Sequence, residues 1–236
     1  MTKPTIVHGA WADASSWDAV ATRLRAHDFT VLAPPNPLRG VESDAAYLSS
    51  FVAQRVSGPV VLAGHSYGGV VISNAAGNAG DVRALVYVNA FIPAEGESIF
   101  AILGGSGSAL DVPDPTTVLD VAGYPGAPDG DAEAFLKPET VGRYFAQDLS
   151  EEQQWLIAAG QRPITLSANA GPTVSAAWRT IPSWAVVGTD DLVIPAATQR
   201  SMAERAGSKI AEVAASHVSL VSQPQAVTDA ILAAAA

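Results

Sequence analysis

The segment GHSYG at residues 64–68 places a serine between two glycines, directly after the apolar run VVLA at 60–63. The apolar run predicts a buried strand, and the glycine–serine–glycine spacing predicts a sharp turn that opens a helix. A serine on such a turn stands above the sheet, beside the positive end of the helix. Ser66 is therefore a candidate nucleophile, although an ordinary turn also fits the motif alone.

A serine hydroxyl is a weak nucleophile and needs a neighbouring base. The chain has four histidines. His65 lies inside the turn motif, His8 ends the first predicted strand, and His27 ends an exposed predicted helix. His217 follows the last predicted strand, at the sheet edge where loops build the active sites of open α/β proteins. We predict that His217 is the base; a surface or helix-capping histidine is the alternative.

A histidine base needs a carboxylate that fixes its tautomer and stabilises the imidazolium. Asp190 and Asp191 lie just past the penultimate predicted strand, in VGTDDLVIP at 187–195. Either can be the acid, and the other would then help the chain to leave the strand. The chain order serine, aspartate, histidine matches one of the known arrangements of these three groups.

Acyl transfer places negative charge on a carbonyl oxygen, which two backbone N–H groups must meet. The residue after the candidate nucleophile, Tyr67, would supply one of them. The other is expected from the loop after the first strand, HGAW at 8–11. Gly9 lets the backbone approach the site closely, so we predict the N–H of Ala10 as the second donor.

The remaining pattern predicts one α/β domain over residues 1–236. Fully apolar strands are expected at 4–10, 29–35, 59–66, 82–93, 182–191 and 209–217, with helical segments between them. Such strands are buried on both faces, which favours a mostly parallel central sheet with helices on both sides.

Residues 94–181 interrupt this alternation and are predicted to form a helical cap, because an unstructured loop of that length is improbable. The cap region is apolar and rich in aromatic residues, which favours an uncharged, hydrophobic substrate. Five aromatic side chains are candidates for a pocket, but they fit packing of the cap on the sheet equally well: Trp11, Tyr67, Phe100, Trp155 and Trp178.

Composition limits the partners. The net charge of −10 argues against nucleic acid, and the absence of cysteine excludes disulfides and thiolate metal sites. The first residues enter an apolar strand without a leader pattern, and no apolar run is long enough to cross a membrane. We expect a cytoplasmic monomer or homodimer that acts on a small molecule without membrane contact.

Five segments together resemble the α/β-hydrolase superfamily, and within it the branch of plant methyl-ester esterases and hydroxynitrile lyases. They are VHGAW (7–11), GHSYGG (64–69), NAFIPAEGES (89–98), VGTDDLVIP (187–195) and SHVSLVSQP (216–224). The resemblance implies the α/β-hydrolase fold, no cofactor and no metal. The family pattern G-x-x-D-x-x-x-P aligns Asp191 with the acid, and it aligns Ala10 and Tyr67 with the oxyanion donors.

Two positions depart from the lyases of this branch. Val218 stands where they have a lysine, and Gly9 stands where they have a threonine. The resemblance therefore implies hydrolysis of carboxylic esters, lactones or thioesters through an acyl group on Ser66. As an aromatic side chain beside the predicted oxyanion donor, Trp11 is predicted among the substrate-binding residues. Two alternatives stay open: lyase-type chemistry at the same site, and a small-molecule receptor without turnover.

Overall fold

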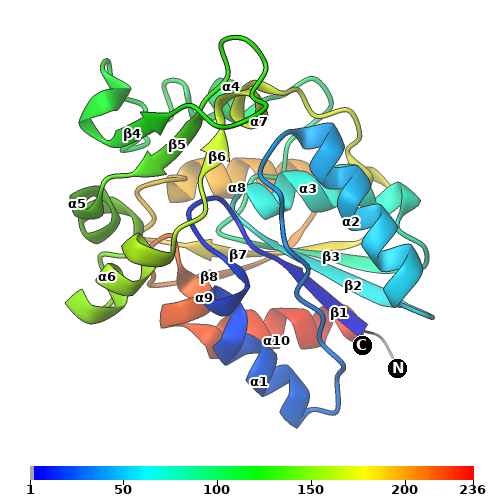
Figure 1. The fold of residues 1–236 in the computed structure, drawn as a ribbon. Coiled ribbons are helices and arrows are strands. Elements are labelled where there is room, and N and C mark those ends of the chain that lie inside the picture. Colours follow the sequence, from blue (N-terminus) through cyan, green and yellow to red (C-terminus); the bar gives the residue numbers. More distant parts are fainter. Residues whose placement is uncertain (1–2) are drawn as a thin grey trace.

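Five parallel strands form the central sheet of the computed structural model, which describes residues 3–236 (Figure 1). Their order across the sheet is β1, β2, β3, β7, β8, and every neighbouring pair is parallel. The strands are β1 (Lys3–Val7), β2 (Val60–His65), β3 (Val82–Val88), β7 (Ser183–Gly188) and β8 (Lys209–Val213). The predicted α/β class with a parallel sheet is confirmed.

Helices cover both faces of this sheet (Figure 1). One face carries α1 (Asp18–Ala26) and α10 (Pro224–Ala235), which pack against each other, with the short α9 (Ser219–Ser222) beside them. The other face carries α2 (Val41–Arg55), α3 (Tyr67–Ala75) and α8 (Ala196–Arg205). Crossover helices on both faces are what parallel pairing of consecutive strands requires.

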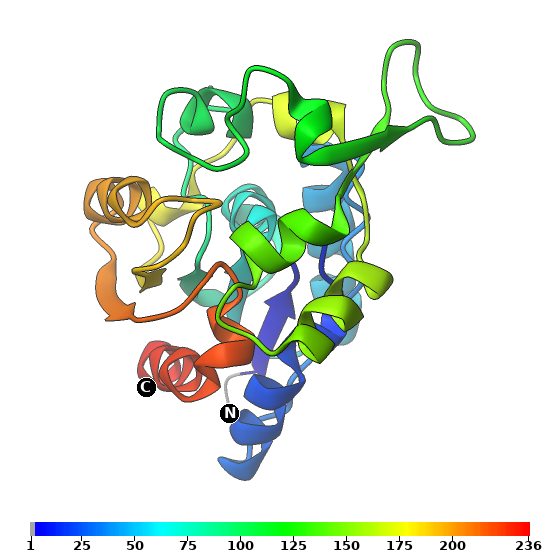
Figure 2. The same cartoon turned by 90° about the vertical axis from the view of Figure 1, so that its left-hand side faces the viewer.

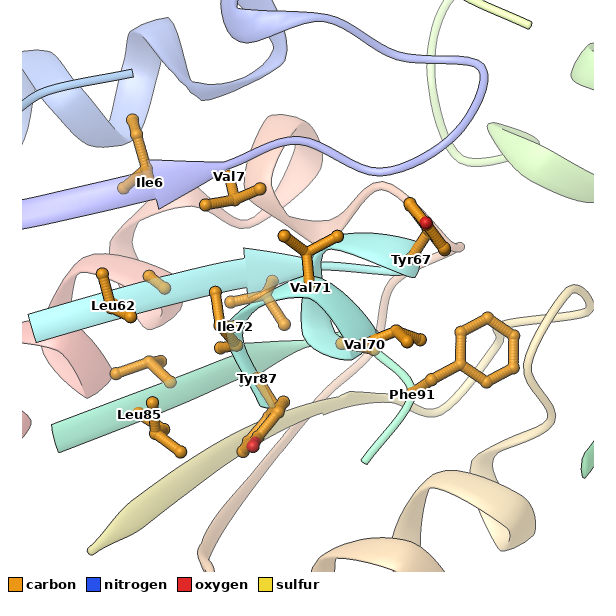
Figure 3. Packing of buried hydrophobic residues seen from close by; sticks show 14 of the residues in the cluster. Ile6, Val7, Leu62, Tyr67, Val70, Val71, Ile72, Leu85, Tyr87 and Phe91 are labelled. Atoms are coloured by element: carbon orange, nitrogen blue, oxygen red, sulfur yellow. The ribbon is translucent and has the colours of Figure 1, made fainter. Parts of the chain in front are cut away.

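The sheet core explains why the strands are apolar along their whole length. All six residues of β2 are buried, as are most of those in β3. Leu62 and Leu85 lie beside α3, and they share one buried cluster with the α3 residues Val71 and Ile72 (Figure 3). A central strand between two helical layers has no solvent face, so a polar residue on it would be buried without a partner.

One predicted strand, at 29–35, is not a strand. The segment runs beside β1 and forms two backbone hydrogen bonds, from Ile6 N to the Leu32 oxygen (2.9 Å) and from Leu32 N to the Pro4 oxygen (3.1 Å). Only the bridge between Thr5 and Leu32 is regular. Pro34 and Pro35 have no N–H to extend the pairing, so the segment leaves the sheet edge at once.

The insertion at 94–181, called the cap below, lies over the carboxyl end of the sheet (Figure 2). It contains the expected helices and also a three-stranded antiparallel sheet, which was not predicted. The helices are α4 (Ile99–Leu103), α5 (Pro138–Thr140), α6 (Glu151–Gly160) and α7 (Leu166–Ala170), and the strands are β4 (Leu119–Ala122), β5 (Glu133–Leu136) and β6 (Ile164–Thr165). The green loop between β4 and β5 projects away from the body.

The register of the parallel strands brings their carboxyl ends to one edge. Val7 lies opposite Gly64, His65 opposite Val88, and Gly188 opposite Val213. The loops that follow β1, β2, β3, β7 and β8 therefore emerge side by side beneath the cap. Those loops hold the candidate functional residues.

Candidate active site

Ser66 lies at the junction of β2 and α3 in a strained backbone conformation, with φ 53° and ψ −121°. Non-glycine residues rarely adopt positive φ, and such strain gathers at functional sites. The turn is possible only with small neighbours. A Cβ on Gly64 would lie 2.5 Å from the carbonyl of Gly68, and a Cβ on Gly68 would lie 2.5 Å from the oxygen of Val7. The glycines of the motif thus let the turn fold back onto β1 and β2.

A continuous hydrogen-bonded chain joins the three predicted side chains. His217 Nε2 lies 2.9 Å from Ser66 Oγ, and His217 Nδ1 lies 2.8 Å from Asp191 Oδ2. All three residues are buried. The ring of Phe145, from the cap, packs on the His217 ring at a centroid distance of 5.0 Å. The imidazole is therefore fixed between a hydroxyl and a carboxylate, and the Phe145 ring covers part of it.

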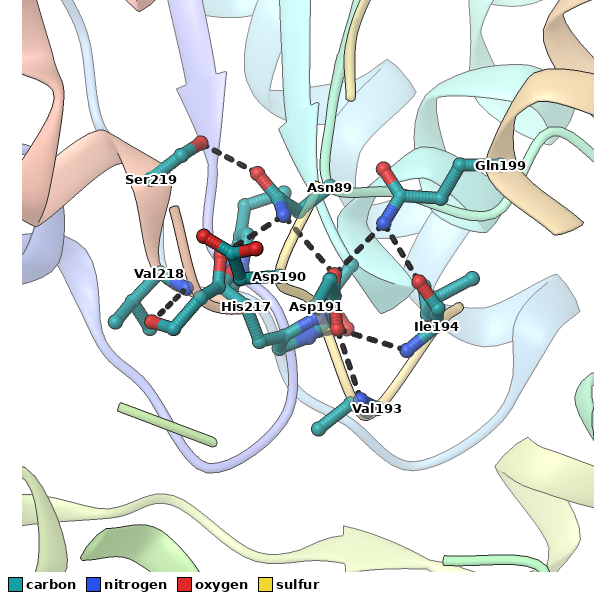
Figure 4. A network of polar contacts seen from close by, with 12 residues as sticks. Asn89, Asp190, Asp191, Val193, Ile194, Gln199, His217, Val218 and Ser219 are labelled. Atoms are coloured by element: carbon teal, nitrogen blue, oxygen red, sulfur yellow. Dashed lines mark hydrogen bonds and ion pairs between the residues drawn. The ribbon is translucent and has the colours of Figure 1, made fainter. Parts of the chain in front are cut away.

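The structure separates the two adjacent aspartates (Figure 4). Asp191 Oδ1 accepts hydrogen bonds from the amides of Val193 and Ile194, at 2.8 and 2.9 Å. Its Oδ2 also accepts from the side chains of Asn89 (2.9 Å) and Gln199 (2.8 Å). Asp190 is exposed, and its backbone oxygen accepts from Gln147 at 2.7 Å. Only Asp191 meets the imidazole, as the family pattern implied.

Asn89 has a central place that the sequence analysis did not assign. It follows β3 with φ 43°, and its Nδ2 also donates to the backbone oxygen of Ser216, at 3.0 Å. Its Oδ1 accepts from the hydroxyl of Ser219. One amide thereby connects the loop of Asp191 with the residues on both sides of His217. Asparagine tolerates positive φ better than most residues, which fits its position after a strand.

The other histidines lie outside the chain of three. His65 is fully buried, and its Nε2 donates to the backbone oxygen of His217 at 2.8 Å. Burial lowers the pKa of His65 well below its ordinary value, and the neighbouring His217 lowers it further. His8 is also buried with a lowered pKa, accepts from the amide of Asn36 and lies against Gly9. His27 is exposed at the end of α1.

Two backbone amides near Ser66 have no acceptor among the described residues. Within residues 3–236, neither the N–H of Ala10 nor that of Tyr67 has a protein acceptor. Tyr67 is the first residue of α3, where an N–H has no partner in its own helix. Ala10 lies on the loop after β1, and a Cβ on Gly9 beside it would come within 2.6 Å of Ser66 Cβ. The two predicted donors thus flank Ser66.

Two side chains hold these donors in place. The hydroxyl of Tyr67 donates to Asp44 Oδ2 at 2.8 Å, and Asp44 is buried at the start of α2. Burial raises the pKa of the Asp44 carboxyl, although the bond from Tyr67 lowers it in part. Trp11 has φ 57°, and its indole N–H donates to the oxygen of Ala134 in β5, at 2.8 Å. The loop after β1 is thus fastened to the cap.

A cavity of about 270 Å³ opens above Ser66 between the sheet edge and the cap. Its walls are mostly apolar. They include the predicted Trp11, Tyr67 and Phe100, together with residues such as Leu103, Leu119, Ile164 and Val193. Trp155 and Trp178, also candidates for a pocket, do not line it: Trp155 is 66 % exposed on α6, and the indole of Trp178 donates to the oxygen of Pro93.

Within residues 3–236 there is no cluster of three or more His, Asp or Glu side chains that could hold a metal ion. Over the same residues, every helix is too short or too polar to cross a bilayer. The site described so far consists of a serine, a histidine and an aspartate in contact, two unpaired amides, and an apolar cavity.

The family model described as the alpha/beta hydrolase family matches residues 6–230. The chain belongs to this family. The strand order, the strained serine and the insertion before β7 are thus features of an α/β hydrolase, and the predicted superfamily is confirmed.

Curated relatives of this α/β hydrolase include one esterase and one further hydrolase. A carbendazim hydrolyzing esterase of Nocardioides sp. is 32% identical over 44% of this chain, and the match spans about half (48%) of that protein. A pyrethroid hydrolase of Sphingobium wenxiniae is 28% identical over 98% of this chain and 86% of that protein. Among solved structures, polyneuridine aldehyde esterase covers 100% of both chains with a TM-score of 0.82 and 20% identity, which shows the shared fold.

Proposed function

We propose that this α/β hydrolase cleaves carboxylic esters of small, uncharged, hydrophobic molecules through an acyl-enzyme on Ser66. The observation that carries the proposal is the chain Ser66–His217–Asp191 at the base of an apolar cavity. The name of the carbendazim hydrolyzing esterase supports ester hydrolysis as the reaction type, and the name of the pyrethroid hydrolase supports hydrolysis.

The first half of the reaction would form the acyl-enzyme. Ser66 Oγ attacks the ester carbonyl carbon while His217 Nε2 takes the hydroxyl proton. Asp191 holds the other ring nitrogen and stabilises the imidazolium. The amides of Ala10 and Tyr67 would donate to the oxygen that gains negative charge. When the C–O bond breaks, His217 returns the proton to the departing alcohol, and the acyl group remains on Ser66.

Water completes the cycle. His217 removes a proton from a water molecule, whose oxygen attacks the acyl carbon, and the same two amides stabilise the second tetrahedral intermediate. Collapse of this intermediate returns the proton to Ser66 Oγ and releases a carboxylic acid. Overall, one ester and one water give one acid and one alcohol.

A panel of p-nitrophenyl esters with increasing acyl length tests the proposal, with lactones and thioesters of matched size beside it. We expect turnover of the esters by the native protein and its loss in Ser66→Ala. Binding of the same molecules without turnover would favour the receptor alternative instead. Turnover that survives Ser66→Ala would overturn the assignment of the nucleophile.

The expected partners, cellular location and oligomeric state are also proposals. The net charge of −10 supports a small-molecule substrate over nucleic acid as the partner. Cytoplasmic location, the absence of membrane contact, and a monomeric or homodimeric state remain predictions from the sequence.

A further inference from the structure

Asn169 is a buried polar side chain in the wall of the apolar cavity above Ser66. It lies on α7 of the cap and is 8 % exposed. The other lining side chains with polar atoms are Trp11, Ser66, Tyr67 and Asp111. The indole N–H of Trp11 donates to the oxygen of Ala134. Ser66 bonds to His217, Tyr67 donates to Asp44, and the exposed Asp111 accepts from the amide of Gly105.

Asn169 keeps hydrogen-bonding capacity that no protein group uses. Its Nδ2 donates to the backbone oxygen of Thr165 at 3.2 Å. Because a carbonyl oxygen can only accept, this contact fixes which end of the side-chain amide is nitrogen. The free end is therefore the oxygen, and Asn169 Oδ1 has no donor within residues 3–236. This oxygen is open to the cavity, so a ligand that displaces water from it without offering a donor leaves a polar atom unpaired, which is costly.

Hydrogen bonds at the start of α7 hold the helix that carries Asn169. Thr165 caps α7, since its hydroxyl accepts from the amide of Ala168 at 3.2 Å. The amide of Thr165 donates to the oxygen of Leu38, at 3.1 Å, which ties this part of the cap to the body of the protein. Asn169 therefore has a defined position relative to Ser66, as a specificity contact requires.

We infer that Asn169 is a specificity-determining residue that accepts a hydrogen bond from a hydroxyl or amide N–H on the substrate, away from the scissile ester. The inference rests on the proposed function, and it narrows the substrate class to hydrophobic neutral esters that carry one such donor. A carboxylate at that end would be disfavoured, because it has no proton to give to Oδ1 and because Asp111 is a negative group on the same cavity.

Binding to Ser66→Ala protein tests this inference without any turnover. In one ligand series the variable group is in the acyl part: methyl 3-(4-hydroxyphenyl)propanoate, its 4-methoxy analogue and the unsubstituted ester. In a second series it is in the alcohol part: 4-hydroxybenzyl, 4-methoxybenzyl and benzyl acetate. The methoxy group can accept a hydrogen bond but cannot donate one, so it separates donation from general polarity.

We expect the hydroxyl ligand of at least one series to bind about threefold to tenfold more tightly than both of its analogues. Adding Asn169→Leu should bring that ratio close to one, and Asn169→Ala should do the same if the leucine variant does not fold. Leu166→Met, a volume-conserving change in the same wall, should keep the ratio. Equal binding in both series, or a preference that survives loss of Asn169, would overturn the inference.

The ratio of kcat/KM for the hydroxyl and unsubstituted esters, measured with Ser66 intact, is the second readout. We expect it to follow the binding ratio in the native protein and to fall toward one in Asn169→Leu. If no ester is hydrolysed but the difference in Kd remains, the proposed reaction fails while the role of Asn169 stands. If esters are hydrolysed without any preference that depends on Asn169, the reaction stands and the role of Asn169 fails.

Discussion

Asn89 Nδ2 donates a hydrogen bond to Asp191 Oδ2 at a distance of 2.9 Å, although the two residues are 102 positions apart in the chain. The same amide reaches the backbone oxygen of Ser216, next to His217, so one side chain connects the loop of Asp191 with the loop of His217. We expect Asn89→Ala to lower kcat at least about tenfold, because a small misplacement of catalytic groups is costly. Loss of the hydrogen bond to the buried carboxylate of Asp191 should also lower the free energy of unfolding by about 1.5–3 kcal/mol.

Asn89→Gly is the matched control, because glycine adopts the positive φ of this position without strain but brings no amide. Both variants should lose activity to a similar extent, as measured by steady-state kinetics on one p-nitrophenyl ester. Native activity in Asn89→Gly would show that the backbone conformation, and not the hydrogen bond, is what matters.

Substitution of Asp191 should lower kcat far more than substitution of Asp190. Asp191→Asn replaces the carboxylate that meets His217 Nδ1, and we expect a loss of kcat of about four orders of magnitude, since the amide supports the wrong tautomer. Asp190→Asn changes an exposed side chain whose backbone makes the local contacts, so kcat should stay within about threefold. A larger effect at Asp190 than at Asp191 would reverse the assignment.

The turn at Ser66 depends on the absence of a side chain at Gly68. Gly68→Ala would place a Cβ 2.5 Å from the carbonyl oxygen of Val7, so we expect destabilisation by about 1–3 kcal/mol in urea unfolding. Gly77→Ala is the control, because a Cβ there would meet nothing within 4 Å, and its effect should stay within about 0.5 kcal/mol. Equal stability of the two variants would contradict the packing argument.

Acid should destabilise the protein in part through its buried histidines. The pKa values of His8 and His65 are lowered in the folded state, mainly by burial, so the unfolded chain takes up protons first as pH falls below 6.5. The stability that the neutral forms of His8 and His65 give to the fold is fully present above pH 6.5. It is lost as the pH decreases toward the pKa values that these histidines have in the folded protein. His65 alone should account for up to about 1.4 kcal/mol per pH unit.

His65→Gln tests this dependence, because glutamine can still donate to the backbone oxygen of His217 but does not titrate. The free energy of unfolding, measured by urea at pH 7.5 and pH 5.5, should fall less for the variant than for the native chain. Identical pH slopes would mean that His65 takes up its proton equally well in the folded state.

The sequence predicted the parts of the site that local patterns mark. Ser66 stands in a motif of fixed spacing after an apolar strand, and His217 and the aspartate pair follow strands whose carboxyl ends must share one edge. The choice of Asp191 over Asp190 came from the family pattern. No local signal separates two adjacent aspartates after one strand.

Other parts depend on contacts between distant residues, which no local pattern marks. Asn89 and Gln199 are isolated polar residues in the sequence, and their roles arise only when β3 and α8 meet the loop of Asp191. Asn89 does lie in NAFIPAEGES, one of the segments that carry the family resemblance. That segment marked the position, but it did not indicate what the side chain contacts. In the cap, β6 is two residues long, too short for alternation of polar and apolar residues to be visible.

The most direct test of the central claim is the mass of the protein after reaction with a fluorophosphonate, followed by mapping of the labelled peptide. We predict one phosphonyl group per chain, located on Ser66, with a proportional loss of ester hydrolysis. Protein that stays unlabelled while it hydrolyses esters, or a label on any other residue that accounts for the lost activity, would contradict the assignment of Ser66 as the nucleophile.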